Sequence, residues 1–220
     1  SKVALVSTLA LILAGTAGFF IFEYDNPRTL GGFSTGGKLM AALFQSVTTR
    51  TAGFATVPQE ALSGASVTLS LLLMFIGGSP VGTAGGIKTV TAAVLFAATL
   101  SVIRGRRDVN LFHRRISENA VRKAAAVACW SFLTAFVSTL LLAAVIDAPL
   151  ADILYETVSA TATVGLSRNL TASLPTAGKL IICAAMYFGR VGPISIAMAL
   201  TSRSERENIV KNPVEEISIG

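Results

Sequence analysis

The sequence predicts an all-α membrane protein made of parallel repeats, each with a helix, a re-entrant loop and a second helix. Of its 220 residues, 52% are hydrophobic and only 14% are charged, whereas about a quarter of the residues in ordinary soluble chains are charged. Long apolar runs alternate with apolar segments that are too short to cross a bilayer. The same order of features also occurs twice along the chain.

Four apolar runs are long enough to cross a bilayer, because a spanning helix needs about twenty mainly apolar residues. The runs 3–22 and 124–146 contain no charged residue and predict continuous helices. The run 65–103 exceeds one crossing, and the glycine-rich string 77–86 within it predicts a break. The run 180–200 is also expected to be interrupted, by Gly189, Arg190, Gly192 and Pro193.

Basic residues predict which side of the membrane each connection occupies, because cytoplasmic loops hold an excess of lysine and arginine. Seven lie in the segment 104–123, three follow residue 200, and Lys2 precedes the first run. We therefore expect a multi-pass protein of the cell membrane with its N-terminus, central loop and C-terminus in the cytoplasm. The net charge of +6 then mainly reflects the basic residues of the segments assigned to the cytoplasm. We expect no nucleic-acid partner, because such a protein would carry its basic residues on a soluble polar face.

Two segments between the crossings, 36–58 and 149–175, hold apolar stretches too short to span the membrane. Each stretch ends in a string rich in threonine with a glycine, which is a poor helix former. Non-helical backbone at membrane depth is tolerated only where it is buried in protein or lines a water-filled path. Each segment therefore predicts a short helix that enters from outside, followed by extended backbone that lines a pore.

One offset of 112 positions relates the two halves of the chain. The residues that recur at this offset include Thr51 as Thr163, Gly53 as Gly165, Met74 as Met186 and Gly77 as Gly189. The order of spanning helix, re-entrant loop and interrupted helix recurs with them. We therefore predict two repeats, 1–106 and 107–220, in the same orientation around an axis along the membrane normal.

Each loop contains a string suited to presenting backbone carbonyls to a cation. A potassium filter replaces the hydration shell of the ion with rings of carbonyl oxygens, as in the string TVGYG, and glycine supplies backbone angles that a side chain disfavours. For either loop alone, an ordinary turn is the alternative; two loops at equivalent places in a repeat favour a filter. The candidate filter residues are Thr51, Ala52, Gly53 and Phe54 in the first loop and Thr163, Val164, Gly165 and Leu166 in the second.

Four strings resemble the third and fourth repeats of the Trk/Ktr/HKT superfamily of potassium transporters, most like the membrane subunit of the Ktr system: TTRTAGFATVP, MFIGGSPVGTAGGIKT, ATVGLSRNLT and MYFGRVGP. The resemblance covers nearly the whole chain. It implies four repeats around one pore, so we expect two more repeats, in a longer polypeptide rather than in a second chain. It also implies a gate formed by a loop beneath the filter, with the residues Gly77, Gly78, Ser79, Pro80, Gly82, Thr83, Gly85 and Gly86.

Arg190 lies near mid-membrane depth, where a charge costs about 2.5 to 3.5 kcal/mol on insertion scales and normally faces a bundle interior or an aqueous path. One interpretation is a structural arginine that caps backbone carbonyls freed by the neighbouring glycines and proline. The other is a cation just inside the filter that repels permeating ions, and the resemblance implies this role in the gate. The two interpretations are compatible.

Two further cations accompany the loops. Lys88 follows the glycine-rich string, and both snorkelling to the interface and a role in the gate stay open for it. Arg50 lies within the first filter loop, where a positive charge facing a cation path would be unfavourable. We expect it to point behind the filter, for instance toward Asp152 or Glu156.

These features predict potassium uptake across the cell membrane, passive or coupled to another ion. Potassium is the expected substrate and sodium a possible coupling ion. A sodium or mixed cation channel is the alternative; in the resembling family, glycine at the filter position accompanies potassium selectivity, and both loops have it. An intramembrane enzyme is disfavoured, because no spanning run contains an aspartate, glutamate or histidine.

The expected partners follow from the membrane and from the resemblance. Lipid surrounds the spanning helices. The resemblance implies a homodimer and a cytosolic ring of nucleotide-binding regulatory subunits, for which the basic loop 104–123 and the C-terminal tail are candidate docking regions. The same loop is equally explained as a topology signal. We expect no bound cofactor and no metal site beyond potassium, since the single histidine, His113, has no suitably spaced ligands.

Overall fold

The computed structural model describes residues 2–79, 85–106, 108–112 and 114–203, with the backbone alone for 192–203. Its regular structure is almost entirely helical, which confirms the predicted all-α class. The helices are α1 (Lys2–Glu23), α2 (Thr35–Thr48), the 3-10 helix η1 (Gln59–Ala61), α3 (Gly64–Phe75), α4 (Thr89–Ile103), α5 (Glu118–Val145), α6 (Leu150–Thr161), α7 (Leu170–Ser173) and α8 (Thr176–Arg203). Two short strands, β1 (Asn110–Leu111) and β2 (Arg114–Arg115), pair antiparallel between α4 and α5.

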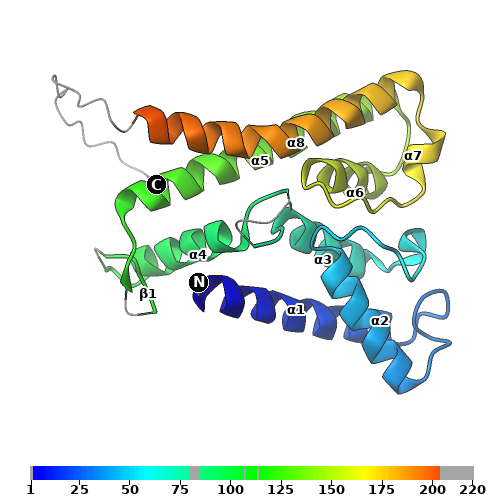
Figure 1. The fold of residues 1–220 in the computed structure, drawn as a ribbon. Helices are drawn as coiled ribbons and strands as arrows, with labels where there is room; N and C mark the ends of the chain where they lie inside the picture. The colour runs from blue at the N-terminus through cyan, green and yellow to red at the C-terminus, as the bar shows by residue number, and fades with distance from the viewer. Residues whose placement is uncertain (1, 80–84, 107, 113, 204–220) are drawn as a thin grey trace.

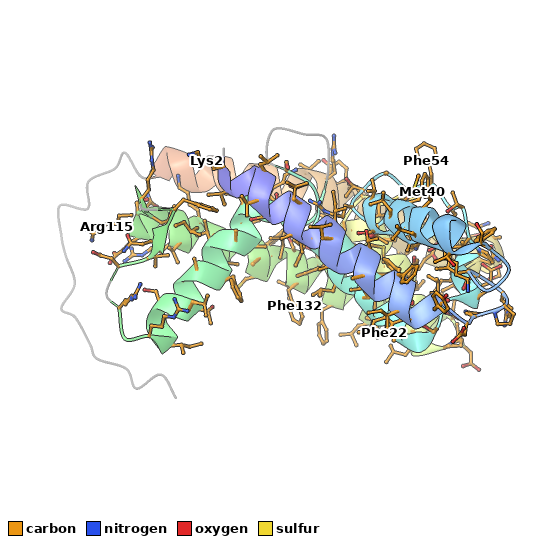
Figure 2. All side chains as sticks on the ribbon, turned by 90° about the horizontal axis from the view of Figure 1, so that it is seen from below. Lys2, Phe22, Met40, Phe54, Arg115 and Phe132 are labelled. Carbon is orange, nitrogen blue, oxygen red and sulfur yellow. The ribbon has the colours of Figure 1, made fainter. Side chains whose placement is uncertain are left out.

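Helices α1 and α5 are long and apolar enough to cross a membrane, and α3 and α4 are shorter apolar helices. Only 17% of the most apolar window of α1 and 22% of that of α5 is buried by the rest of the chain. Phe22 and Phe132 are exposed and point outward along one edge (Figure 2). A helix that is apolar all round belongs in a protein core or in a membrane. Since the described part of the chain leaves most of the surface of α1 and α5 uncovered, these surfaces are suited to contact with lipid.

The same succession of elements occurs twice (Figure 1). Helix α1 packs against α2 and α3, and α5 packs in the same way against α6 and α8. The two units contact each other through α3 with α6 and through α4 with α5. The short helices α2 and α6 lie toward one end of the molecule, whereas the start of α1, the β1–β2 hairpin and the end of α8 lie toward the other (Figure 1). The exact repeat boundaries at 1–106 and 107–220 stay a prediction.

The second crossing of the first unit is broken, as its sequence predicts. Helix α3 ends at Phe75 and α4 begins at Thr89. Backbone hydrogen bonds join the two ends of the break, from Ile87 N to Phe75 O at 3.1 Å and from Thr89 N to Gly78 O at 3.1 Å. The chain therefore leaves the helix and returns to nearly the same place before it continues as α4.

The predicted interruption of the run 180–200 is wrong, because α8 is one helix through this region. Gly189 has another role: a Cβ atom there would clash with the carbonyl oxygen of Thr161 at the end of α6. A glycine at this position lets the two helices approach closely. A single proline is also tolerated in a membrane helix, whereas the broken crossing has five glycines and a proline within 77–86.

A buried carboxylate that the sequence did not single out holds the C-terminal end of α1 in place. Glu23, 1% exposed, closes α1. Its Oε1 accepts hydrogen bonds from Ser63 N at 2.8 Å and Ser63 Oγ at 2.7 Å, and its Oε2 accepts from Asn26 Nδ2 and Thr29 Oγ1, each at 2.6 Å. Ser63 is also the N-cap of α3. Glu23 thus joins the end of α1 to the start of α3.

The close approach at Gly189 predicts an unusual response to alanine. Alanine in place of a helical glycine normally stabilises a helix by about 0.5 to 1 kcal/mol. We expect Gly189→Ala to destabilise the protein by about 1 to 3 kcal/mol, the usual cost of overpacking. The thermal unfolding midpoint of the purified protein in detergent measures this.

Gly64→Ala in the first turn of α3 is the matched control, because an added Cβ there meets nothing within 4 Å. It should leave the midpoint unchanged or raise it. A Gly189→Ala variant as stable as the Gly64→Ala variant would contradict the packing assigned to α6 and α8.

Candidate functional site

The two candidate filter segments follow the C-terminal ends of α2 and α6 and share one backbone pattern. Thr51 has φ +70° and Gly53 has φ +78°; Thr163 has φ +55° and Gly165 has φ +92°. The residue between each pair has a negative φ, so left-handed residues alternate with ordinary ones. A left-handed threonine is strained by about 1 to 3 kcal/mol, and such strain gathers at functional sites. Alternation of this kind turns successive peptide carbonyls toward the same side.

The structure brings the two segments into direct contact. A Cβ atom on Gly53 would clash with the carbonyl oxygen of Val164, and a Cβ atom on Gly165 would lie 3.9 Å from the Cα atom of Gly53. Both glycines have a positive φ, and the contact with Val164 also leaves no room for a side chain at Gly53. Backbone from the two units lies side by side where each unit has its TxG string.

The side chains of the two segments have different surroundings. Val164 is 4% and Leu166 3% exposed, and both belong to the main hydrophobic core. Phe54 is 71% exposed and projects with Met40 from the edge opposite Phe22 and Phe132 (Figure 2). The backbone of Phe54 is nevertheless held, because its N–H donates to Thr48 Oγ1 at 2.8 Å and its carbonyl accepts from the same hydroxyl at 2.5 Å.

The described end of the glycine-rich string lies against the second filter segment. Gly85 N donates to Thr163 Oγ1 at 2.9 Å, and a Cβ atom on Gly85 would also press on the carbonyl oxygen of Ala162. Gly77 in turn packs against the Gly85 carbonyl. The structure thus brings the start and the end of the predicted gate loop together beneath Thr163.

The remaining gate residues fall into two groups. Gly86 has φ +66°, the Gly78 carbonyl accepts from Thr89 N, and Ser79 Oγ lies 3.3 Å from Thr8 Oγ1. Pro80, Gly82 and Thr83 lie outside the described residues.

Two cations lie near the same loop. Lys88 is half-buried at the N-cap position of α4, and Arg190 is exposed on α8, next to the glycine that contacts α6. The two side chains come from different units, and a role of either one in the gate stays a prediction.

The suggested pairing of Arg50 with Asp152 or Glu156 is wrong, because the described hydrogen bonds of Arg50 go elsewhere. Its Nη1 donates to the carbonyl of Thr8 at 3.2 Å and its Nη2 to the carbonyl of Gly77 at 3.5 Å. Both acceptors are backbone groups, which residue types do not reveal. Arg50 therefore joins α2 to α1 and to the first residue of the glycine-rich string.

The acidic groups of α6 have other partners, and these were missed. Asp152 Oδ1 accepts from Arg168 Nε at 2.6 Å, and Glu156 accepts from Ser167 Oγ at 2.9 Å and from Thr171 Oγ1. Arg168 and Ser167 come directly after the second filter segment. The polar string SRN after a filter glycine was the available signal for these contacts.

A buried polar network also lies behind the filter. Tyr155, fully buried, donates from its hydroxyl to Gln59 Oε1 at 2.9 Å, and Gln45 Nε2 donates to the same oxygen at 2.7 Å. Burial raises the pKa of Tyr155 to about 12, so the hydroxyl remains a donor at physiological pH. The network joins α2, η1 and α6, and the available signal for it was a glutamine in α2 and a tyrosine in α6.

A family model described as a cation transport protein, TrkH, matches residues 2–212. The chain belongs to the TrkH family of cation transport proteins. Membership confirms the resemblance drawn from the four strings, and this family is one of transport proteins and not of enzymes.

Among the relatives that match this chain over its whole length, three illustrate the similarity. It is 38% identical to the Ktr system potassium uptake protein B of Bacillus subtilis, covering 49% of that protein. It is 37% identical to the protein of the same name from Vibrio alginolyticus, covering 48%. It is 34% identical to the potassium/sodium uptake protein NtpJ of Enterococcus hirae, covering 50%. The chain therefore spans about half the length of these TrkH-family relatives.

A solved member of the family shares the fold. The potassium transporter TrkH from Vibrio parahaemolyticus superposes with a TM-score of 0.71 over 93% of this chain and 44% of that one, at 19% identity. At this identity the comparison supports the arrangement of helices alone.

The surroundings of the two filter glycines predict unequal responses to alanine. Either substitution places a side chain at positive φ, which costs about 1 to 2 kcal/mol. Gly53→Ala also meets the Val164 carbonyl, so we expect it to destabilise the protein by about 1 to 3 kcal/mol more than Gly165→Ala. Thermal unfolding midpoints in detergent compare the two. Equal midpoints would contradict the close contact between the segments.

Proposed function

We propose that this chain forms part of a potassium-selective pore that takes up potassium across the cell membrane. The carrying observation is the pair of adjacent segments in which threonine and glycine have left-handed backbone at equivalent positions. Carbonyls presented in this way replace the hydration shell of potassium. The filter is made by Thr51, Ala52, Gly53 and Phe54 and by Thr163, Val164, Gly165 and Leu166.

Two segments cannot surround an ion, so the complete transporter contains four repeats. The length of the relatives supports this, since the chain covers about half of each. Phe54 and Met40, 71% and 66% exposed, form an apolar edge that neighbouring repeats cover. Potassium is the substrate, and its uptake is either passive or coupled to sodium. The basic loop 104–123 and both termini are cytoplasmic, and a homodimer binds a nucleotide-dependent regulatory ring there.

A mixed sodium and potassium pathway is the second candidate, and one relative favours it, because that protein is named for uptake of both ions. Glycine at both visible filter positions favours potassium. The side chain introduced by a serine would disturb the carbonyl positions on which this selectivity depends.

The glycine-rich loop acts as the gate beneath the filter. The hydrogen bond from Gly85 N to Thr163 Oγ1 supports this role because it occupies a hydroxyl at the inner end of the second filter segment. Arg190 and Lys88 add positive charge to the same region, which repels a permeating cation. Opening then requires the loop to leave Thr163 and the cations to move aside.

The filter is tested by Gly165→Ser in the complete transporter, since an added Cβ at Gly165 has its nearest described neighbour at 3.9 Å. We expect the preference for potassium over sodium to fall about tenfold, because altered carbonyl positions fit potassium less well. Radioactive rubidium and sodium uptake into proteoliposomes measures the preference. Unchanged selectivity in a well-inserted variant would contradict the filter.

The gate is tested by Arg190→Gln. We expect potassium flux to rise about fivefold, which corresponds to removing about 1 kcal/mol of repulsion between unit charges 4 Å apart in water. Arg28→Gln is the control, because Arg28 is an exposed arginine in the loop after α1 and lies outside the loop 104–123. Equal flux in both variants would place the barrier elsewhere.

A further inference from the structure

Resting on the potassium filter proposed above, we propose that Arg168 is a positioning residue that fixes the separation of the two filter segments and thereby sets ion selectivity. Arg168 comes three residues after Gly165. None of its described hydrogen bonds goes to a carbonyl of the candidate filter residues, and its side chain is only 13% exposed. Its contacts cross from one unit to the other.

The guanidinium group of Arg168 donates to both units at once. Nε donates to Asp152 Oδ1 in α6 at 2.6 Å. Nη1 donates to the carbonyl of Gln59 at 2.8 Å and Nη2 to the carbonyl of Glu60 at 3.3 Å. Gln59 and Glu60 belong to η1, on the chain that leaves the first filter segment. Arg168 therefore connects the residues that follow the second filter segment to the residues that follow the first.

Tyr155 provides a second connection at the same place. The guanidinium carbon of Arg168 lies 5.9 Å from the centre of the Tyr155 ring. The Tyr155 hydroxyl donates to the Gln59 side chain, which also donates to the carbonyl of Val57 at 2.8 Å. Val57 lies four residues beyond Gly53. Arg168 and Tyr155 thus hold the backbone of η1 and, through Gln59, the segment that leads to η1 from Gly53.

The chemistry of this cluster suits positioning and not ion binding. A guanidinium group has five donors in a rigid fork, and here three nitrogens have acceptors in two units. The charge of Arg168 is compensated by Asp152, so the pair adds no net positive charge beside a cation path. Because the segments already touch at Gly53 and Val164, a small relative shift changes the spacing of the carbonyls.

The experiment measures the ratio of rubidium to sodium uptake for variants of the complete transporter in proteoliposomes. Arg168→Gln and Arg168→Lys should each lower this ratio about fivefold or more, because neither side chain can keep three directed hydrogen bonds. Total uptake and insertion should change much less. Arg28→Gln is the matched control: Arg28 is an exposed arginine in the loop after α1, and its variant should keep the parent ratio.

Each outcome has a separate meaning. A selective parent with an unchanged ratio in Arg168→Gln overturns the positioning role alone, whereas a parent without selectivity contradicts the proposed function itself. A parent-like ratio in Arg168→Lys with a lowered ratio in Arg168→Gln assigns the effect to charge and also overturns the positioning role.

If Arg168→Gln does not insert, Asp152→Asn and Tyr155→Phe decide. Each removes one partner interaction and keeps the size of the side chain. A lowered ratio in both supports the proposal, and a parent-like ratio in both overturns it.

Discussion

Non-helical backbone within a membrane needs a hydrogen-bond partner or access to water, and this requirement governs the arrangement of the whole chain. Each unit has a helix, α2 or α6, that is too short to cross a bilayer. The chain then continues into a segment that contains residues with a positive φ. Side-chain hydroxyls satisfy part of this backbone, as Thr48 does for Phe54 and Thr163 for Gly85. The carbonyls that remain are the groups suited to replace water around a cation.

The glycines at equivalent positions in the two units, Gly77 and Gly189, make different close contacts. In the second unit, Gly189 lets an unbroken α8 lie against the carbonyl of Thr161. In the first, Gly77 packs against the carbonyl of Gly85 in a loop that leaves the helix and returns. Equivalent glycines thus serve one close contact between helices and one loop beneath the filter. Among the described residues, this asymmetry gives the first unit a glycine-rich break, which we propose as the gate, and gives the second unit a continuous helix.

Patterns local in sequence could be predicted, whereas contacts between distant residues could not. The length of the apolar stretches predicted the short helices α2 and α6, and the TxG strings predicted the left-handed backbone at Gly53 and Gly165. A glycine can break a helix or permit close packing, and only the neighbour decides, so Gly189 was misinterpreted. The partners of Arg50 are backbone carbonyls, which have no sequence signal. Arg168 was missed because its acceptors lie about a hundred residues away, at Gln59 and Glu60.

In the proposed pore, the carbonyls of the two TxG segments bind the transported ion. Anomalous diffraction from crystals of the complete transporter soaked in thallium or rubidium locates such ions directly. We predict density on the axis beside the carbonyls of Thr51 to Phe54 and Thr163 to Leu166, displaced by excess potassium and not by equal sodium. Ion density found only away from these carbonyls, in crystals that show the segments ordered, would contradict the account.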